Sequence, residues 1–179
     1  TLGFSLNFKN VLPFTIGKII LPIVKGCQKD TKMEMPTPNA AVLNKKSHIV
    51  RRLSKVLPRE SVISEEHETR AYECDALTAY RCSPMIAVLP ENTQQVSDIL
   101  RICHEEGVPV VPRGSGTSLA GGAMPTADCV ILGVAKLNDV LETDYDNRLI
   151  RVQSGRTNLS VSGAVEEDGF FYAPDPSSQ

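Results

Sequence analysis

Residues 108–123 read VPVVPRGSGTSLAGGA, and this stretch decides what kind of fold the chain can adopt. A short apolar run, Val108–Val111, meets Pro112 and then enters a loop with glycine at four of the next ten positions. Glycine lets the backbone take positive φ angles and come close to a ligand. Successive N–H groups that are turned the same way form a concave anion site. The stretch therefore predicts a strand that leads into an anion-binding loop.

Side chains in the same loop strengthen that prediction. Ser115, Thr117 and Ser118 supply hydroxyl donors. Arg113 supplies a forked cation of the kind that suits phosphate oxygens, and it is the only formal charge between Glu106 and Asp128. We interpret the loop as a site for a polyanion, with a diphosphate as the natural candidate. The alternative, a glycine-rich connection that binds nothing, stays open on residue types alone.

Two familiar phosphate loops do not fit. The dinucleotide fingerprint G-x-G-x-x-G needs glycine at position 119, where the chain has Leu119. The P-loop pattern G-x-x-x-x-G-K-[ST] fits from Gly116 to Gly121, but Gly122 and Ala123 replace its Lys and its Ser or Thr. The loop is therefore neither a standard Rossmann nucleotide loop nor an NTPase loop.

Composition places the chain among soluble globular proteins. Of 179 residues, 41% are hydrophobic and 22% charged, with a net charge of −2, so no basic surface points to nucleic acid. The five cysteines are scattered, with no C-x-x-C pair, and we expect reduced thiols, several of them buried. His48, His67 and His104 are far apart in the sequence, and no metal site is predicted.

Residues 1–46 are predicted to be an amino-terminal extension and linker outside the packed domain, which then covers residues 47–179. The first 32 residues are apolar and contain lysine but only one acid, Asp30. Lys9, Lys18 and two prolines interrupt the apolar run, which argues against the ~20 apolar residues of a membrane span. An organelle-targeting segment and an artefact of the reading frame both stay open. Residues 36–46, PTPNAAVLNKK, are expected to be a linker.

The remaining chain predicts alternating helices and strands. A helix is expected over 47–57, capped by Ser47 and stopped by Pro58, followed by ordered loop over 59–84 with at most a short helix. A strand over 85–89, a helix from residue 92 or 93 to 106 and a strand over 108–111 form a unit in which the strands should pair in parallel. The inward face of that helix is assigned to the side chains of Val96, Ile99, Leu100 and Cys103.

Further strands and turns follow the glycine-rich loop. We expect a strand over 129–134 and a hairpin of strands 140–145 and 149–153. A helix should run from Thr157 or Asn158 to about Glu167, with Gly169 closing it, and a short strand is expected over 170–173.

Four motifs in a fixed order resemble one known family. YECDALTAYR (72–81), VPVVPRGSGTSLAGGA (108–123), RVQSGRTNLS (151–160) and YAPDPSSQ (172–179) are similar to segments of the FAD-linked oxidases of the vanillyl-alcohol-oxidase type. Within that family the resemblance is strongest to the branch that holds the flavin subunits of glycolate oxidase and the D-lactate dehydrogenases. The similar region runs from Tyr72 to Gln179.

The resemblance implies an α+β fold of the FAD-binding (PCMH) type. A small parallel α/β subdomain packs against an antiparallel α+β subdomain in that fold, and the carboxyl-terminal part is expected to be missing here. The family's cofactor segments match the glycine-rich loop and the segment that begins at Pro174. The implied cofactor-binding residues are Pro112, Arg113, Gly114, Ser115, Gly116, Thr117, Ser118, Pro174, Asp175, Ser177 and Ser178. Because the loop contains no His, we expect the FAD to be non-covalent.

The implied activity is that of a flavin-dependent 2-hydroxy-acid dehydrogenase or oxidase. A small 2-hydroxy acid would be the substrate of the intact enzyme, with an electron-acceptor or iron–sulfur subunit as a candidate partner. The family's metal-ligand and catalytic residues correspond to chain beyond Gln179, so no residue here is assigned a catalytic role. The expected location is cytoplasmic, with membrane association through partners or organelle targeting both open. The rival interpretation is a non-catalytic FAD- or nucleotide-binding module or partner subunit.

Overall fold

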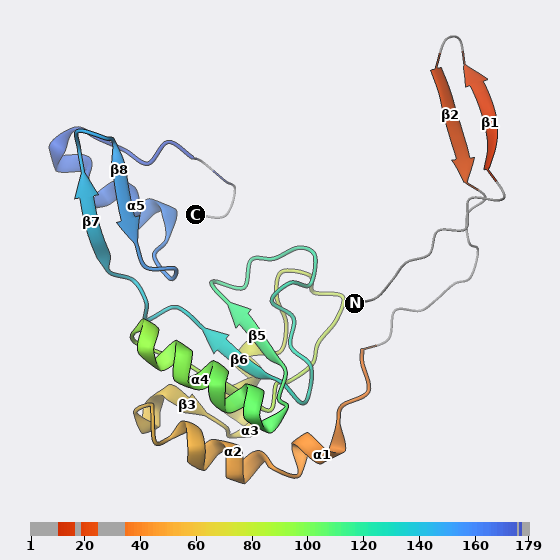
Figure 1. Cartoon of the computed structure of the whole chain (residues 1–179), viewed down its shortest axis with the longest axis vertical. Coiled ribbons are helices and arrows are strands. Elements are labelled where there is room, and N and C mark those ends of the chain that lie inside the picture. Colours follow the sequence, from red (N-terminus) through yellow and green to blue (C-terminus); the bar gives the residue numbers. More distant parts are fainter. Residues whose placement is uncertain (1–10, 17–18, 25–34, 175, 177–179) are drawn as a thin grey trace. The chain divides into compact units, whose positions relative to one another are not determined.

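The computed structural model describes residues 11–16, 19–24, 35–174 and 176 of the chain (Figure 1). Two units are distinguished, Thr1–Glu34 and Met35–Gln179. In the first unit, β1 (Val11–Ile16) and β2 (Ile19–Val24) pair as antiparallel strands, with Pro13 opposite Pro22. Of the helices in the described ranges, none has both the length and the apolar character needed to cross a membrane.

The second unit is built on a four-stranded sheet with the order β3-β4-β6-β5. The strands are β3 (Val62–Ile63), β4 (Ile86–Val88), β5 (Val110–Arg113) and β6 (Val130–Gly133). Strand β6 pairs in parallel with both β4 and β5, and β3 adds an antiparallel edge.

The expected direct pairing of the strands over 85–89 and 108–111 was wrong, because β6 lies between them. All four residues of β6 are buried, as expected for a strand with partners on both sides. Strand β5 contains Pro112, which has no N–H to donate, and proline is tolerated at a sheet edge. The sequence over 59–84, expected to be loop, also supplies the edge strand β3.

Side chains alternate across the two faces of the sheet. Ile86, Val88, Val130 and Leu132 join one apolar cluster with the helices. Ala87, Cys129 and Ile131 form a second cluster on the opposite face, where Ile63, Tyr72 and Val111 pack against them. Both faces are therefore covered, which explains why these strands are continuous apolar runs rather than alternating ones.

Helices α2 (Lys46–Leu53) and α4 (Thr93–Glu106) lie next to each other and cover the first face (Figure 1). The predicted ends of α4 are confirmed, since the Asn92 side chain accepts from the Gln95 N–H at 3.0 Å and Gly107 ends the helix with φ 67°. The inward face differs at one position. Leu100 is 45% exposed and Ile102 is buried, because Ile99, Ile102 and Cys103 follow the spacing of the face that meets the sheet.

The segment expected to be a linker is partly folded. Helix α1 (Ala40–Leu43) lies within 36–46, and its Val42 side chain joins the core. The Asn39 N–H donates to the buried Asp128 carboxylate at 2.8 Å, and this bond holds the Asp128 pKa below its ordinary value. Helix α2 begins one residue earlier than expected, at Lys46, without a side-chain cap from Ser47, and ends at Leu53.

The last part of the described chain is a hairpin followed by a helix. Strands β7 (Val140–Asp144) and β8 (Leu149–Val152) pair antiparallel around a turn in which Arg148 has φ 54°. Thr157 caps α5 (Asn158–Gly163), which ends earlier than expected and is followed by a short 3-10 turn, Glu166–Asp168. The expected strand over 170–173 was wrong, because this segment is irregular and belongs to none of the sheets in the described part of the chain. A short helix, α3 (Glu66–Thr69), lies between β3 and β4.

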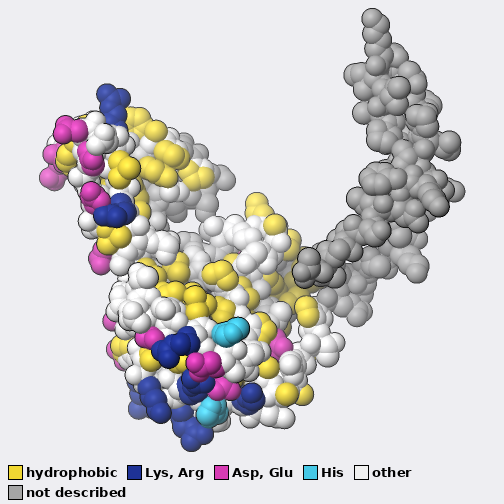
Figure 2. Space-filling model, in the orientation of Figure 1, with side chains coloured by type: hydrophobic (Ala, Val, Ile, Leu, Met, Phe, Trp, Pro, Cys, Tyr) yellow, Lys and Arg dark blue, Asp and Glu magenta, His cyan; other side chains and the backbone are white. Residues whose placement is uncertain are grey.

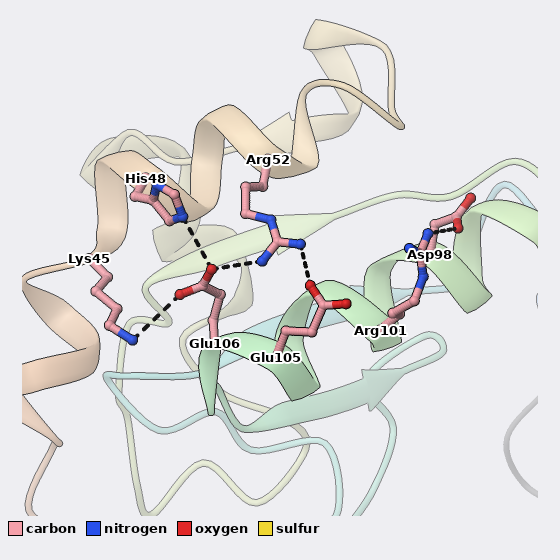
Figure 3. Close-up of polar contacts among 7 residues, drawn as sticks. All are labelled: Lys45, His48, Arg52, Asp98, Arg101, Glu105 and Glu106. Atoms are coloured by element: carbon pink, nitrogen blue, oxygen red, sulfur yellow. Dashed lines mark hydrogen bonds and ion pairs between the residues drawn. The ribbon is translucent and has the colours of Figure 1, made fainter.

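Ion pairs fasten the amino-terminal helices to the end of α4 (Figure 3). The Glu106 carboxylate accepts from Arg52 at 2.7 Å, from His48 at 3.1 Å and from Lys45 at 3.4 Å, and Arg52 also pairs with Glu105. The Arg52 bond is the largest reason that the pKa of Glu106 lies below its ordinary value. Glu106 is the centre of this network, because its carboxylate accepts hydrogen bonds from three side chains in a different part of the chain.

We expect Glu106→Gln to lower the thermal midpoint of unfolding at neutral pH more than Asp98→Asn does. Asp98 is the matched control, because its partners among the described residues, Arg101 and Gln94, both lie in α4 itself. A carboxyl whose pKa is lowered in the folded state stabilises that state above its unfolded pKa of about 4.3. The difference between wild type and Glu106→Gln should therefore shrink as the pH falls below that value. A pH-independent difference in scanning calorimetry would contradict the ion-pair account.

We propose that the packed domain begins near Met35, so that residues 1–34 are dispensable for its stability. Deletion of 1–34 should leave the free energy of unfolding unchanged. Deletion of 1–45 should lower it by about 2–3 kcal/mol, through loss of the Val42 burial and the bond to Asp128. Urea unfolding of the two truncated proteins makes the comparison. Equal stabilities would show that α1 is not part of the domain.

Candidate functional site

The glycine loop, residues 114–123, starts where β5 ends at the carboxyl edge of the parallel strands. Ligands of α/β sheets bind at this edge. Gly116 and Gly121 hold φ angles of 74° and 77°, in the left-handed region that favours glycine. Gly114 has no positive φ, and a Cβ there would meet no atom within 4 Å. The backbone conformation therefore favours glycine at Gly116 and Gly121, whereas it places no such requirement on Gly114.

Hydrogen bonds inside the loop fix its second half. The Ser118 hydroxyl oxygen accepts from the N–H of Ala120 at 3.3 Å and from the N–H of Gly122 at 3.0 Å. A Cβ at Gly122 would lie 3.3 Å from the same oxygen. Ser118, expected to offer a donor to a ligand, thus also organises the loop's own backbone.

The segment after the 3-10 turn Arg70–Tyr72 packs against the glycine loop and supports it. The Asp75 carboxylate is 4% exposed, accepts from the N–H of Leu77 at 2.8 Å and accepts from the N–H of Ala123 at 3.4 Å. A Cβ added at Gly121 would lie 3.6 Å from Cδ2 of Leu77, so the Leu77 side chain lies next to this part of the loop. The motif 72–81, which carries no ligand-binding assignment from sequence, is therefore the base on which the glycine loop rests.

Arg113 points into this base. Its Nη1 donates to the carbonyl oxygen of Cys74 at 2.8 Å and to that of Ala123 at 3.4 Å. The guanidinium carbon lies 5.8 Å from the centre of the Tyr72 ring. The cation predicted to meet phosphate is thus held by carbonyl oxygens and an aromatic ring.

A cavity of about 530 Å³ opens beside the start of the glycine loop. Gly114 and Ser115 form one wall, and the second wall comes from 154–160, inside the third sequence motif. The described lining residues are Gly114, Ser115, Ala135, Asn138, Ser154, Gly155, Arg156, Thr157, Asn158 and Ser160. Among them Arg156 is the only charged residue, and four carry hydroxyl groups. The lining suits an anion that also accepts hydrogen bonds.

Close backbone packing holds the second wall in place. The N–H of Gly155 donates to the carbonyl of Leu137 at 2.7 Å, and a Cβ at Gly155 would lie 2.8 Å from that oxygen and would overlap the carbonyl oxygen of Val134. Arg156 donates to the carbonyls of Asn138 at 2.8 Å and Ser160 at 2.9 Å. Its buried Nε has no partner among the described residues. No cofactor-binding residue was predicted in this wall, although its sequence SGRTN (154–158) lies within the third of the four motifs.

Of the second predicted cofactor segment, only Pro174 can be placed. Asp175, Ser177 and Ser178 lie outside the described residues. Pro174 lines a different, apolar cavity of about 450 Å³ between the β7–β8 hairpin and 165–174. The structure therefore does not bring Pro174 to the cavity beside the glycine loop.

Apolar side chains are exposed around that second cavity. Leu149 is 53% exposed and Phe171 is 76% exposed, and Figure 2 shows hydrophobic side chains gathered over the hairpin. Leu141, Tyr145, Leu159, Phe170 and Tyr172 are exposed in the same part of the chain.

The described residues contain no group of three His, Cys, Asp or Glu side chains placed to hold a metal ion. The four cysteines in the described ranges are free thiols, and Cys103 and Cys129 are buried. Burial raises the pKa of the Cys103 thiol to about 11, so it remains protonated at neutral pH.

The chain is similar in sequence to known flavin-family proteins that are named as subunits of glycolate oxidase. The glycolate oxidase subunit GlcD of Escherichia coli strain K12 is 42% identical over 134 residues, which cover 75% of this chain and 27% of that protein. GlcD of Bacillus subtilis strain 168 is 46% identical over 107 residues, 60% of this chain and 23% of that protein. The chain thus spans about a quarter of the length of these relatives.

A solved structure shows the same fold. p-Cresol methylhydroxylase with substrate bound superposes with a TM-score of 0.64 at 22% identity, over 75% of this chain and 27% of that one. This likeness confirms the predicted α+β fold of the p-cresol methylhydroxylase type. The family model described as FAD binding domain matches residues 84–179, which contain the glycine loop and both walls of the cavity. The chain therefore belongs to the FAD binding domain family.

Proposed function

We propose that the chain is the FAD-binding portion of a flavin-dependent 2-hydroxy-acid dehydrogenase or oxidase of the glycolate or D-lactate type. The observation that carries the proposal is the polar cavity beside a glycine loop at the carboxyl edge of the sheet. The substrate class rests on the relatives, since both GlcD proteins are named as subunits of glycolate oxidase.

The residues present fit the FAD pyrophosphate. Gly114 and Ser115 line the cavity with backbone that a phosphate can approach, and the two arginine-to-carbonyl bonds of Arg156 fix a cation in the opposite wall. We propose FAD contacts for Pro112, Gly114, Ser115, Gly116, Thr117, Ser118, Pro174, Asp175, Ser177 and Ser178, and we add Arg156 and Thr157 from the second wall.

The chain's own part in the reaction is to bind and orient. Bound FAD would supply the redox chemistry by accepting the hydride from C2 of the hydroxy acid. The glycine loop carries no His, so the proposed attachment is non-covalent. The loop and the second wall would fix the pyrophosphate, and with it the direction in which the rest of the cofactor extends.

The remaining parts of such an enzyme belong to the proposal as well. The substrate site, the proton acceptor and an electron-acceptor or iron–sulfur partner subunit would lie outside these 179 residues. The exposed apolar side chains around Leu149 and Phe171 are where we expect further chain of the enzyme to pack. We propose a cytoplasmic location, with membrane association through partners and organelle targeting as the alternatives.

A non-catalytic FAD-binding module is the second candidate function. It is favoured by one observation: among the described residues, the cavity lining offers no carboxylate, imidazole or thiol that could take a proton from a substrate. The two candidates differ in turnover. The 179-residue chain by itself should oxidise neither glycolate nor D-lactate with an artificial electron acceptor, whereas the full-length protein should oxidise at least one of them. Full-length protein that binds FAD and oxidises neither acid would favour the module.

We expect Gly116→Val in the full-length protein to leave the fold intact and to lower the flavin bound per chain. Valine at φ 74° strains the turn by roughly 1–3 kcal/mol and pushes on the loop's packing. Gly163→Ala is the control, because a Cβ there meets nothing within 4 Å and the residue lies at the end of α5. Flavin absorbance beside circular dichroism makes the comparison. Wild-type flavin content in Gly116→Val would mean that the loop does not hold the cofactor.

A further inference from the structure

We infer that Arg113 is a positioning residue, which sets the shape of the glycine loop from beneath and does not contact a phosphate of the cofactor. The inference rests on the proposed function, because it states how the loop is prepared for FAD. It replaces the expectation that the forked guanidinium itself grips the diphosphate.

The pleat of β5 fixes the direction of the Arg113 side chain. Side chains two residues apart in a strand point to the same face. Val111 packs in the second apolar cluster with Tyr72 and Ile131, so Arg113 must extend over that same face. Its guanidinium accordingly lies near the Tyr72 ring, at 5.8 Å from the ring centre. The side chain runs under the loop and is not among the residues that line the cavity beside it.

The guanidinium meets protein on several sides. Nη1 bridges two carbonyl oxygens, Cys74 at 2.8 Å and Ala123 at 3.4 Å, and so links the base to the far end of the glycine loop. Asp75 holds the same Ala123 residue through its N–H. A Cβ added to Gly116 would lie 2.7 Å from the guanidinium carbon, so the Gly116 backbone rests directly on the cation.

This packing gives Gly116 a second reason to be glycine. Besides its φ of 74°, the residue leaves the space that the guanidinium fills. The loop backbone at Gly116 therefore stands between the cation and a ligand on the loop's outer side. The positive charge of Arg113 still favours an anion on the other side of the loop, but its hydrogen bonds go to carbonyl oxygens of the protein and not to the ligand.

The first test compares Arg113→Lys with Arg113→Met in the full-length protein. Lysine keeps the charge and serves phosphates as a point charge, but it lacks the planar guanidinium that lies over the Tyr72 ring while its Nη1 donates to two carbonyl oxygens. We expect both variants to raise the FAD dissociation constant by about tenfold or more, the order expected for lost hydrogen bonds from a charged group. The measurement is flavin fluorescence titration of the apoprotein at a temperature where circular dichroism shows each variant folded. Arg113→Lys with near-wild-type affinity would overturn the inference.

The second test leaves Arg113 in place and removes its support. Tyr72→Leu should weaken FAD binding about threefold or more, because it removes the ring that lies against the guanidinium. Tyr80→Leu is the matched control, since Tyr80 lies in the same segment but its ring does not lie over the Arg113 guanidinium, and it should leave the affinity unchanged. If the two tyrosine variants bind FAD equally well, the Tyr72 ring does not support Arg113 in a way that matters for FAD binding.

The third test is a double-mutant cycle of Gly116→Ala and Arg113→Ala. Since the added methyl strikes the guanidinium, Gly116→Ala should cost several-fold less FAD affinity in the Arg113→Ala background than in wild type. If the fold-changes in the FAD dissociation constant for the two single variants simply multiply in the double variant, the two residues act independently. That is the result expected if Arg113 reached outward to a phosphate. A wild-type protein that takes up no FAD would instead overturn the proposed function, and this inference with it.

Discussion

The parallel pairing of β6 with both β4 and β5 is the constraint on which the rest of the second unit depends. Each residue of β6 is buried, and the pairing sets Arg113 opposite Gly133 at the carboxyl edge of the sheet. Because the strand faces alternate, the pairing also decides that Val111 and Arg113 extend over one face while α2 and α4 cover the other. The direction of the glycine loop and the side chain beneath it both follow from this register.

Contacts within the protein fix the shape of the glycine loop. Ser118 organises its second half, Asp75 and Arg113 hold Ala123, and Gly116 rests on a guanidinium. A loop that is fixed in this way loses little conformational freedom when it takes up a ligand, which favours binding. The opposite wall is equally fixed, because Gly155 packs directly against the carbonyl oxygens of Val134 and Leu137. The donor groups that face the cavity are thus held on rigid neighbours.

The sequence alone predicted much of this arrangement. The strand at 86–88, helix α4 with its two caps, and the β7–β8 hairpin were visible because buried runs, cap residues and turn residues are local signals. The position of β6 between β4 and β5 was not predicted, since strand order depends on contacts between distant residues. Helix α1 was missed because PTPNAAVLNKK looks polar and proline-rich, while the burial of Val42 comes from tertiary packing.

The site was predicted in part for the same reasons. The glycine loop could be recognised from its composition. The wall at 154–160 could be recognised only from the structure, which places it beside Gly114. The direction of Arg113 could have been derived from the two-residue period shared with Val111, had the faces of β5 been known. The residues Asp175, Ser177 and Ser178 stay a prediction.

The most direct test of the account is an experimental structure of the full-length protein with its flavin bound. The account predicts the FAD pyrophosphate in the cavity beside Gly114 and Ser115, within hydrogen-bond distance of the loop backbone, with the Arg113 guanidinium still on the carbonyl oxygen of Cys74. A flavin bound elsewhere would contradict the cofactor assignment. A pyrophosphate in the cavity with Arg113 turned outward onto its oxygens would contradict the account of how the loop is held.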